Sequence, residues 1–188
     1  MKIFLPFLCT VMLGACGYTY VPQDYDSLSY DSAIAKELIF DMLDHNFEPT
    51  LQGHLDSSLR ASTNARLVVI RDSVDYFFVV DRMSCSSWIQ DDTLWVHISR
   101  SDGFTADGLN IKIKNGKFKC IPFQSTDVIM PGKTEPRIQI EKQKVTLDKE
   151  TFHIGDSVYG HFYMRALVDG RERKYANGYF RTTITTDR

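Results

Sequence analysis

The stretch that decides the fold reads LNIKIKNGKFKCIP, residues 109–122. Its centre, Asn115-Gly116, is the strongest short signal for a β-hairpin, because both positions of a type I′ turn need left-handed backbone. A two-residue loop there pairs Ile113 with Phe118, Ile111 with Cys120 and Leu109 with Pro122. All six side chains are apolar, so this register predicts a hairpin with one buried face and with Cys120 pointing inward.

Period-two alternation continues on both sides of this hairpin, from about residue 66 to the end of the chain. It predicts short strands over 67–70, 74–80, 94–98, 109–113, 118–122, 138–140, 145–147, 158–167 and 175–184. These segments are rich in β-branched and aromatic residues, as strands are. So many short strands favour a mainly β fold, an antiparallel β-sandwich or a partly open barrel. The alternative is an α+β fold in which one helix packs on a curved antiparallel sheet.

A second hairpin is predicted at Asp169-Gly170. A three-residue loop with Gly170 in the left-handed bulge position aligns Val158, Phe162 and Met164 with Phe180, Ala176 and the stem of Lys174 on one face. The other face then carries Tyr159, His161, Tyr163, Arg165, Tyr175, Asn177, Tyr179 and Arg181. Tyrosine rings and guanidinium groups suit contact with a protein or a glycan, so this face is a candidate binding surface. The alternative is a solvated sheet face with cross-strand tyrosine pairs.

The segment before the strands has a helical period. Apolar residues recur at Ala35, Leu38, Ile39, Met42 and Leu43, which predicts an amphipathic helix over about 32–44, packed on the sheet. Leucines spaced by four allow a second short helix within residues 48–65.

Trp95 lies in a strand whose alternation puts Leu94, Val96 and Ile98 on one face and Trp95 on the other, with His97. A tryptophan on a polar face can stack on a sugar or anchor a partner protein. The alternative for Trp95, and for the nearby Trp88, is packing at the rim of the core.

The chain begins with a charged residue, Lys2, an apolar run over 3–12 and the tetrapeptide Leu13-Gly14-Ala15-Cys16. This layout is typical of an export signal, and the run is shorter than the roughly 20 apolar residues of a membrane span. The tetrapeptide resembles the lipobox of bacterial lipoproteins. The resemblance implies cleavage before Cys16 and a diacylglycerol thioether on its sulfur. Gly17, where an Asp would retain the protein at the inner membrane, favours the outer membrane.

The resemblance divides the chain into a signal peptide (1–15), a lipidated tether (16–30) and a single mainly β domain (31–188). Of the four cysteines, Cys85 and Cys120 remain in the exported domain. They could pair in a disulfide or stay as two buried thiols. With a net charge of −2 and no clustered basic segment, the sequence predicts no nucleic-acid partner.

Catalytic motifs are weak. Gly155-Asp156-Ser157 resembles the nucleophile block of a serine esterase family, but in that family the catalytic Asp and His lie far downstream, and this chain ends about 30 residues later. A zinc site can be drawn from His45, Glu48, His54 and Asp56, although their spacing matches no known zinc motif. We therefore expect no catalytic residue, metal or cofactor.

The sequence predicts a lipid-anchored protein of the cell envelope that acts as a non-catalytic binding or structural module. Its partners would be the membrane, through the lipid, and an envelope protein or glycan. The alternatives are a glycan- or small-ligand-binding lipoprotein and an envelope hydrolase.

Overall fold

The computed structural model describes residues 25–49, 55–71, 76–127 and 135–186. The predicted signal peptide and Cys16 lie outside these ranges. The helical elements are a 3-10 helix, η1 (Ile34–Lys36), and an α-helix, α1 (Leu38–Asp44). The strands are β1 (Asp26–Ser27), β2 (Ser29–Tyr30), β3 (Phe47–Pro49), β4 (Leu55–Arg60), β5 (Arg66–Arg71), β6 (Tyr76–Val80), β7 (Ser84–Gln90), β8 (Thr93–Ser101), β9 (Thr105–Lys114), β10 (Lys117–Thr126), β11 (Ile138–Leu147), β12 (Ser157–Val168) and β13 (Glu172–Thr186).

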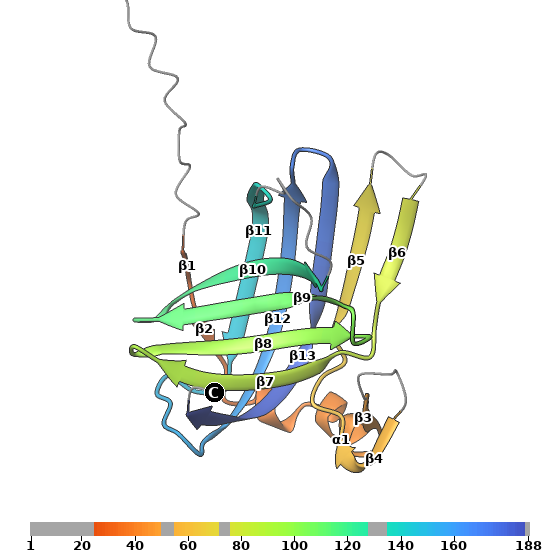
Figure 1. Ribbon diagram of the computed structural model, residues 1–188. Coiled ribbons are helices and arrows are strands. Elements are labelled where there is room, and N and C mark those ends of the chain that lie inside the picture. Colours follow the sequence, from red (N-terminus) through yellow and green to blue (C-terminus); the bar gives the residue numbers. More distant parts are fainter. Residues whose placement is uncertain (1–24, 50–54, 72–75, 128–134, 187–188) are drawn as a thin grey trace, which may run out of the picture.

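The fold is mainly β, as predicted. Eleven strands form one mixed sheet, and nine of them follow the order β1-β10-β9-β8-β7-β13-β12-β11-β2. The other two, β5 and β6, join the sheet where β5 pairs with β13. The sheet is not closed into a barrel. Figure 1 shows β7 to β10 running across the direction of β11, β12, β5 and β6. Strand β13, 15 residues long, belongs to both groups: residues 172–183 pair with β12, residues 172–177 also pair with β5, and residues 184–186 pair with β7.

Two pairings depart from the predicted antiparallel arrangement. Strand β13 runs parallel to β7, and β11 runs parallel to β2. Both join segments far apart in the sequence, so no hairpin turn imposes the antiparallel direction on them.

Both predicted hairpins form, and the first is confirmed in register. Ile113, Ile111 and Leu109 pair with Phe118, Cys120 and Pro122. Asn115 and Gly116 have φ of 52° and 69°, as a type I′ turn requires. In the second hairpin Val168 pairs with Glu172, which leaves a three-residue loop with Gly170 at φ 70°. The loop length and the two faces are as predicted, but the register is shifted by two residues, because Met164 pairs with Ala176 and not with Lys174.

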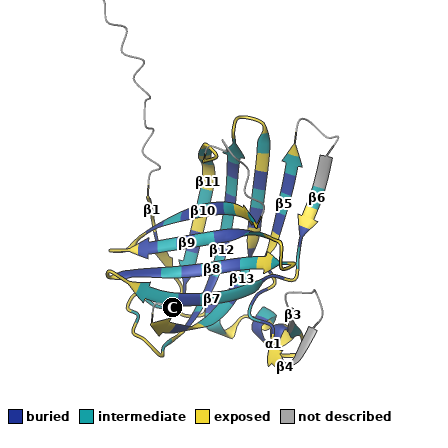
Figure 2. Ribbon diagram, viewed as in Figure 1, coloured by how far each residue is buried: buried dark blue, intermediate teal, exposed yellow. Residues whose placement is uncertain are grey.

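One hydrophobic core draws on both groups of strands. Its largest fully buried side chains include Phe118 from β10, Phe162 from β12 and Phe180 from β13. Along these strands buried and more exposed residues alternate, which Figure 2 shows as changes of colour within each arrow.

The helical segment differs from the predicted amphipathic helix over 32–44. Glu37 has extended backbone (ψ 136°) and separates η1 from α1. The residues of α1 that face the sheet therefore differ in part from those that a continuous helix over 32–44 would bury. Phe40 and Leu43 are therefore the buried residues of α1, whereas Leu38 and Met42 are 70% and 56% exposed. The predicted stripe assumed one unbroken helix.

Several boundaries also differ. Strands β3 and β4 pair within the segment where a second helix seemed allowed, so that alternative is wrong. Strand β7 has no predicted counterpart, because its sequence SCSSWIQ is rich in serine and has a single β-branched residue, Ile89. The predicted strands at 138–140 and 145–147 are one strand, β11, with an irregularity between Ile140 and Lys142.

The chain joins the sheet earlier than the predicted end of the tether at residue 30. Asp26 pairs with Phe118 in β10, and Tyr30 pairs with Leu147 in β11. Leu28, between them, is buried in the core. Residues 26–30 thus connect the two groups of strands. Within the described ranges, no helix has the length and apolar character needed to cross a membrane.

Candidate functional site

Helix α1 packs on part of the predicted binding surface on β12 and β13. Its eight residues share one face, through the pairs Tyr159–Arg181, His161–Tyr179, Tyr163–Asn177 and Arg165–Tyr175. The ring of Phe40 in α1 meets the rings of Tyr159 and Tyr179 edge-on, at centroid distances of 5.0 and 6.0 Å. Tyr159, Tyr179 and Arg181 therefore hold the helix on the sheet rather than facing a ligand.

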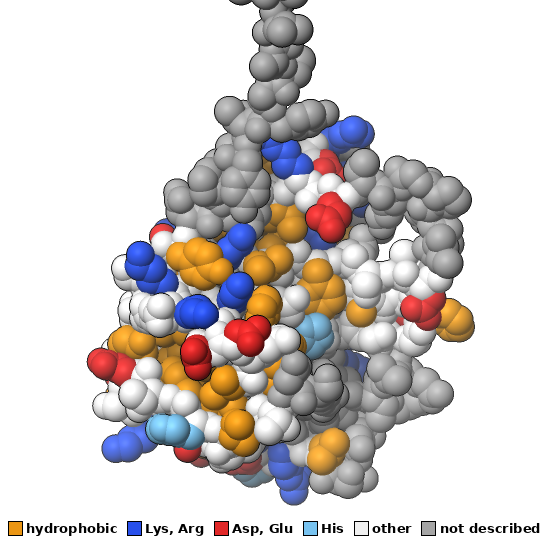
Figure 3. All heavy atoms as spheres, turned by 60° about the vertical axis from the view of Figure 1, so that its left-hand side comes forward, with side chains coloured by type: hydrophobic (Ala, Val, Ile, Leu, Met, Phe, Trp, Pro, Cys, Tyr) orange, Lys and Arg blue, Asp and Glu red, His pale blue; other side chains and the backbone are white. Residues whose placement is uncertain are grey.

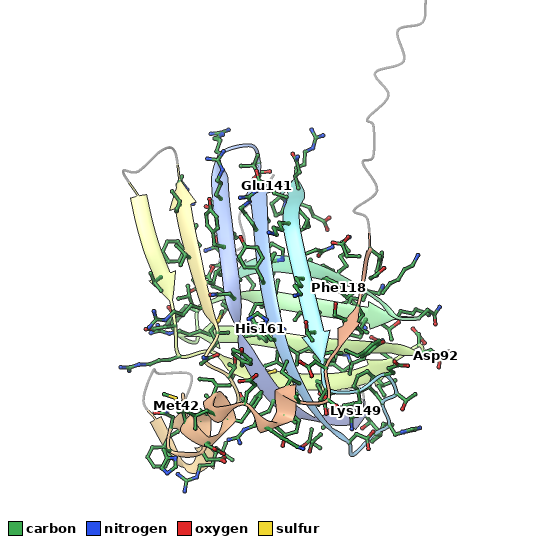
Figure 4. All side chains as sticks on the ribbon, turned by 180° about the vertical axis from the view of Figure 1, so that it is seen from behind. Met42, Asp92, Phe118, Glu141, Lys149 and His161 are labelled. Carbon is green, nitrogen blue, oxygen red and sulfur yellow. The ribbon has the colours of Figure 1, made fainter. Side chains whose placement is uncertain are left out.

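The rest of this face is internally paired. His161 packs on Tyr179 with ring centroids 4.6 Å apart, and Figure 4 shows it on the side of the sheet that carries the helix with Met42. Burial, and then the positive charge of Lys144, lower the pKa of His161. Arg165 pairs with Glu141 at 2.8 Å, and Lys142 lies over the ring of Tyr163. This packing matches the alternative of cross-strand pairs.

A different surface combines aromatic and basic side chains: the outer face of β7 to β10. A row of directly opposed residues crosses these four strands, running Trp88, Trp95, Lys112, Lys119. We call these four residues the Trp–Lys row. The inner residues of β8 are Leu94, Val96 and Ile98, all buried, so the predicted orientation of Trp95 away from the core is confirmed.

The two tryptophans stack. Their ring centroids are 6.2 Å apart and their planes differ by 7°, which is an offset parallel arrangement. The Nζ of Lys112 lies 5.2 Å from the ring centroid of Trp95, within the range of a cation–π contact. Both tryptophans are half-buried. Trp88 thus supports the position of Trp95, and Lys112 places a positive charge beside the same ring.

The neighbouring row extends the aromatic surface. The Nδ1 of His97 lies 2.7 Å from Oδ1 of Asn110, which orients the imidazole. The imidazole stacks on Phe123 with ring centroids 5.1 Å apart and lies 6.3 Å from the ring of Trp88. A continuous set of flat rings therefore covers part of β7, β8 and β10.

Four lysines gather on the same face. Lys112 stands opposite Lys119, and Lys114 stands opposite Lys117. Like charges directly opposite on neighbouring strands are destabilising. Burial, and then the charge of Lys112, lower the pKa of Lys119. None of the four takes part in the salt bridges found in the described part of the chain. The alternation of the hairpin thus gathers four positive charges on one face.

A hollow of about 490 Å³ lies at one end of this face. We call it the Trp95 pocket. Its lining consists of Tyr25, Gln90, Asp91, Thr93, Trp95, Lys112, Lys114, Asn115 and Lys117. The lining holds three lysines against one aspartate, and Lys114 donates a hydrogen bond to the backbone carbonyl of Asp91 at 2.9 Å. Figure 3 shows blue Lys and Arg side chains gathered beside orange hydrophobic ones on this side of the molecule.

A second, shallower hollow of about 390 Å³ contains Ser157. Its lining also includes Asp44 and Arg181, which form an ion pair. Ser157 and His161 are four residues apart on one extended strand, a separation of roughly 13 Å. The hydroxyl and the imidazole are therefore too far apart to act as nucleophile and base. Asp156 accepts a hydrogen bond from the backbone N–H of His153 and pairs with Lys149, as in an ordinary turn.

The two cysteines lie in the same group of strands. Cys85 is on β7 and Cys120 is on β10, with β8 and β9 between them. Three strand spacings separate them by roughly 14 Å, far beyond the reach of a disulfide. The structure therefore holds two thiols. Burial raises the pKa of the Cys120 thiol far above its ordinary value.

No cluster of potential metal ligands is found among the residues that the structure describes. Of the zinc site drawn from the sequence, His45 ends α1, where its ring lies 2.8 Å from the carbonyl of Asp41. His54 falls outside the described ranges.

Comparison with family models, with curated proteins and with solved structures finds no match for this chain. Sequence reasoning singled out Trp95 but missed the lysines around it. The signal was present in the alternation KIKNGKFK over 112–119, which puts every lysine of the hairpin on the face opposite the core.

Proposed function

We propose that this protein is a lipid-anchored, non-catalytic binding module of the cell envelope, and that it binds a glycan at the Trp95 pocket. The observation that carries the proposal is Trp95, which lines the hollow and stacks on Trp88. A pyranose ring presents a flat face of C–H groups, which packs well on an indole ring. The polar atoms of Gln90, Thr93 and Asn115 around the hollow can bond sugar hydroxyls.

The lipid anchor rests on the lipobox resemblance of residues 13–16. The anchor, the tether and the outer-membrane location belong to the same proposal. Tyr25 lines the Trp95 pocket, and the chain enters the sheet at Asp26. If residues 16–25 are extended, they reach roughly 33 Å. The Trp95 pocket would then face the region just above the membrane, where envelope glycans are found.

We also propose that the two groups of strands are the layers of a β-sandwich. Two features support this. The groups cross each other in Figure 1, and a single core cluster takes residues from both, such as Ile111 from β9 and Phe162 from β12. Layers that cross at a large angle are a known form of sheet packing.

The glycan proposal is tested with the mature, detergent-solubilised protein on a glycan array, followed by titration of tryptophan fluorescence. The variant Trp95→Ala should lose binding at least tenfold, because it removes the ring on which the sugar stacks. Tyr163→Ala is the matched control, since it removes a half-buried aromatic ring from the face of β12, away from the pocket. An array without binders, or a Trp95→Ala variant that binds normally, would contradict the proposal.

The anchor is tested separately with Cys16→Ser. We expect the native protein to partition into detergent and to be found in the outer-membrane fraction. The variant should lose both properties, because it lacks the sulfur that carries the lipid. Unchanged partitioning and location would remove the anchor from the proposal without affecting the glycan site.

A further inference from the structure

We infer that the ligand of the Trp95 pocket is an anionic saccharide, a sugar that bears carboxylate or phosphate groups. This inference rests on the proposed function and adds the charge of the ligand. It follows from the positions of four lysines relative to one aromatic ring.

The lysines occupy positions that the fold itself disfavours. The hairpin of β9 and β10 sets Lys112 against Lys119 and Lys114 against Lys117. An ordinary solvated face would alternate signs across strands, since opposite charges stabilise the pairing and like charges weaken it. The ion pairs of the described chain lie elsewhere, as in Arg71–Glu172 and Arg165–Glu141. A bound anion would relieve the repulsion that the fold leaves in place.

The charge lies next to the stacking surface. Lys112 is adjacent to Trp95 in the Trp–Lys row, with Nζ 5.2 Å from the ring centroid. Lys114 and Lys117 line the same pocket. A single sugar unit on Trp95 would therefore have its ring on the indole and an acidic substituent within reach of the ammonium groups. A neutral sugar has no negative charge to interact with these ammonium groups.

A saccharide fits this face better than a bilayer does. Aromatic side chains that insert into a membrane interface protrude from the surface. Here both tryptophans are half-buried and stacked on each other. Of the large apolar side chains exposed in the described chain, only Tyr25 lines the pocket. A concave site with a supported ring is suited to a ligand that enters it.

The test compares four probes with the detergent-solubilised, mature protein, using fluorescence and calorimetry. They are polygalacturonate, neutral dextran of the same length, phosphatidylglycerol vesicles and a single-stranded dT12 oligonucleotide. We expect polygalacturonate to bind at least tenfold more tightly than dextran, with an affinity that falls as salt is raised. The dT12 oligonucleotide should bind more weakly than polygalacturonate. The vesicles should bind through the lipid anchor, independently of the lysines of the Trp95 pocket.

Two double variants with the same change of net charge complete the design. Lys114→Gln/Lys117→Gln should weaken polygalacturonate binding at least tenfold and leave dextran binding unchanged. Lys142→Gln/Lys144→Gln, on β11, is the matched control and should bind both as the native protein does. Trp95→Ala should weaken the binding of both glycans, because it removes the ring on which the sugar stacks.

The outcomes separate the two proposals. The inference of an anionic ligand would be overturned if dextran and polygalacturonate bound equally, or if both lysine double variants weakened polygalacturonate binding equally. The proposed glycan site would remain. Failure of both glycans to bind would overturn the proposed function itself. Tighter binding to dT12 would assign the face to a nucleic acid and overturn the inference. Vesicle binding that Lys114→Gln/Lys117→Gln weakens, and that Lys142→Gln/Lys144→Gln does not, would assign the face to a membrane and overturn it as well.

Discussion

Arg181 holds helix α1 on the sheet through Asp44: its Nη1 lies 2.6 Å from Oδ1 of Asp44. Its Nη2 donates a second hydrogen bond, to the carbonyl of Ala61, at 3.2 Å. One guanidinium group on β13 thus contacts both the helix and the chain that follows β4. The fork geometry of arginine makes this double contact possible.

We predict that Arg181→Gln lowers the free energy of unfolding by about 1 kcal/mol, the size expected for a partly exposed ion pair with one additional hydrogen bond. Arg181→Lys keeps the charge but cannot make both contacts, so it should recover only part of the loss. Urea denaturation measures both. Equal stability of Arg181→Gln and the native protein would mean that the apolar contacts of α1, such as those of Phe40 and Leu43, hold the helix without this ion pair.

The lowered pKa of His161 predicts a stability that depends on pH. Burial favours the neutral imidazole in the folded protein, so the unfolded chain binds the proton more readily. Stability should therefore fall as the pH drops below the ordinary histidine value of about 6.5. His161→Gln cannot be protonated and should show a smaller loss between pH 7 and pH 5 in thermal denaturation. A variant with the same loss would assign the dependence to another group.

Gly178 is required by a close approach of two backbones. A Cβ at this position would lie 2.5 Å from Cα of Ala65, a contact that no side-chain rotation relieves. We predict that Gly178→Ala costs about 1 to 3 kcal/mol, the range for overpacking in a core. Gly116→Ala is the comparison, because open space surrounds that Cβ and only the positive φ opposes it. Its cost should be about 1 kcal/mol, the cost of left-handed backbone for a residue other than glycine. A Gly178→Ala variant less affected than Gly116→Ala in urea would contradict the close contact.

The Cys120 thiol should be unreactive in the folded protein. It is fully buried, and its raised pKa leaves almost no thiolate, the reactive form, at neutral pH. With a thiol reagent such as DTNB, we expect Cys120 to react only after unfolding in urea. Mass spectrometry of the unreduced protein checks the same geometry, and a Cys85–Cys120 disulfide would contradict the strand order.

Much of the local structure follows from the sequence. The turn at Asn115-Gly116 can place its central residues in left-handed backbone, and apolar side chains on alternate positions then allow only one register. The same reasoning predicted the three-residue loop at Gly170. Hairpins are local, so a few residues with known backbone preferences are enough to determine them.

Other features could not be read in this way. The helical period over 32–44 predicted one stripe, but the extended backbone at Glu37 turned Leu38 and Met42 outward. The candidate surface on β12 and β13 was assigned to the correct face, yet nothing in its alternation indicates that Phe40, more than a hundred residues earlier, packs on it.

By itself the sequence determined which side of each strand meets the core and how the hairpin at Asn115-Gly116 is paired, because backbone preference and alternation act between near neighbours. Only the tertiary structure decided that β7 lies between β8 and the end of β13. It also decided that α1 packs on Tyr159 and Tyr179, and that Trp88 and Trp95 stack beside four lysines. These arrangements depend on which distant segments exclude water together. Burial of apolar surface is non-directional, so a local pattern does not specify the partner that completes it.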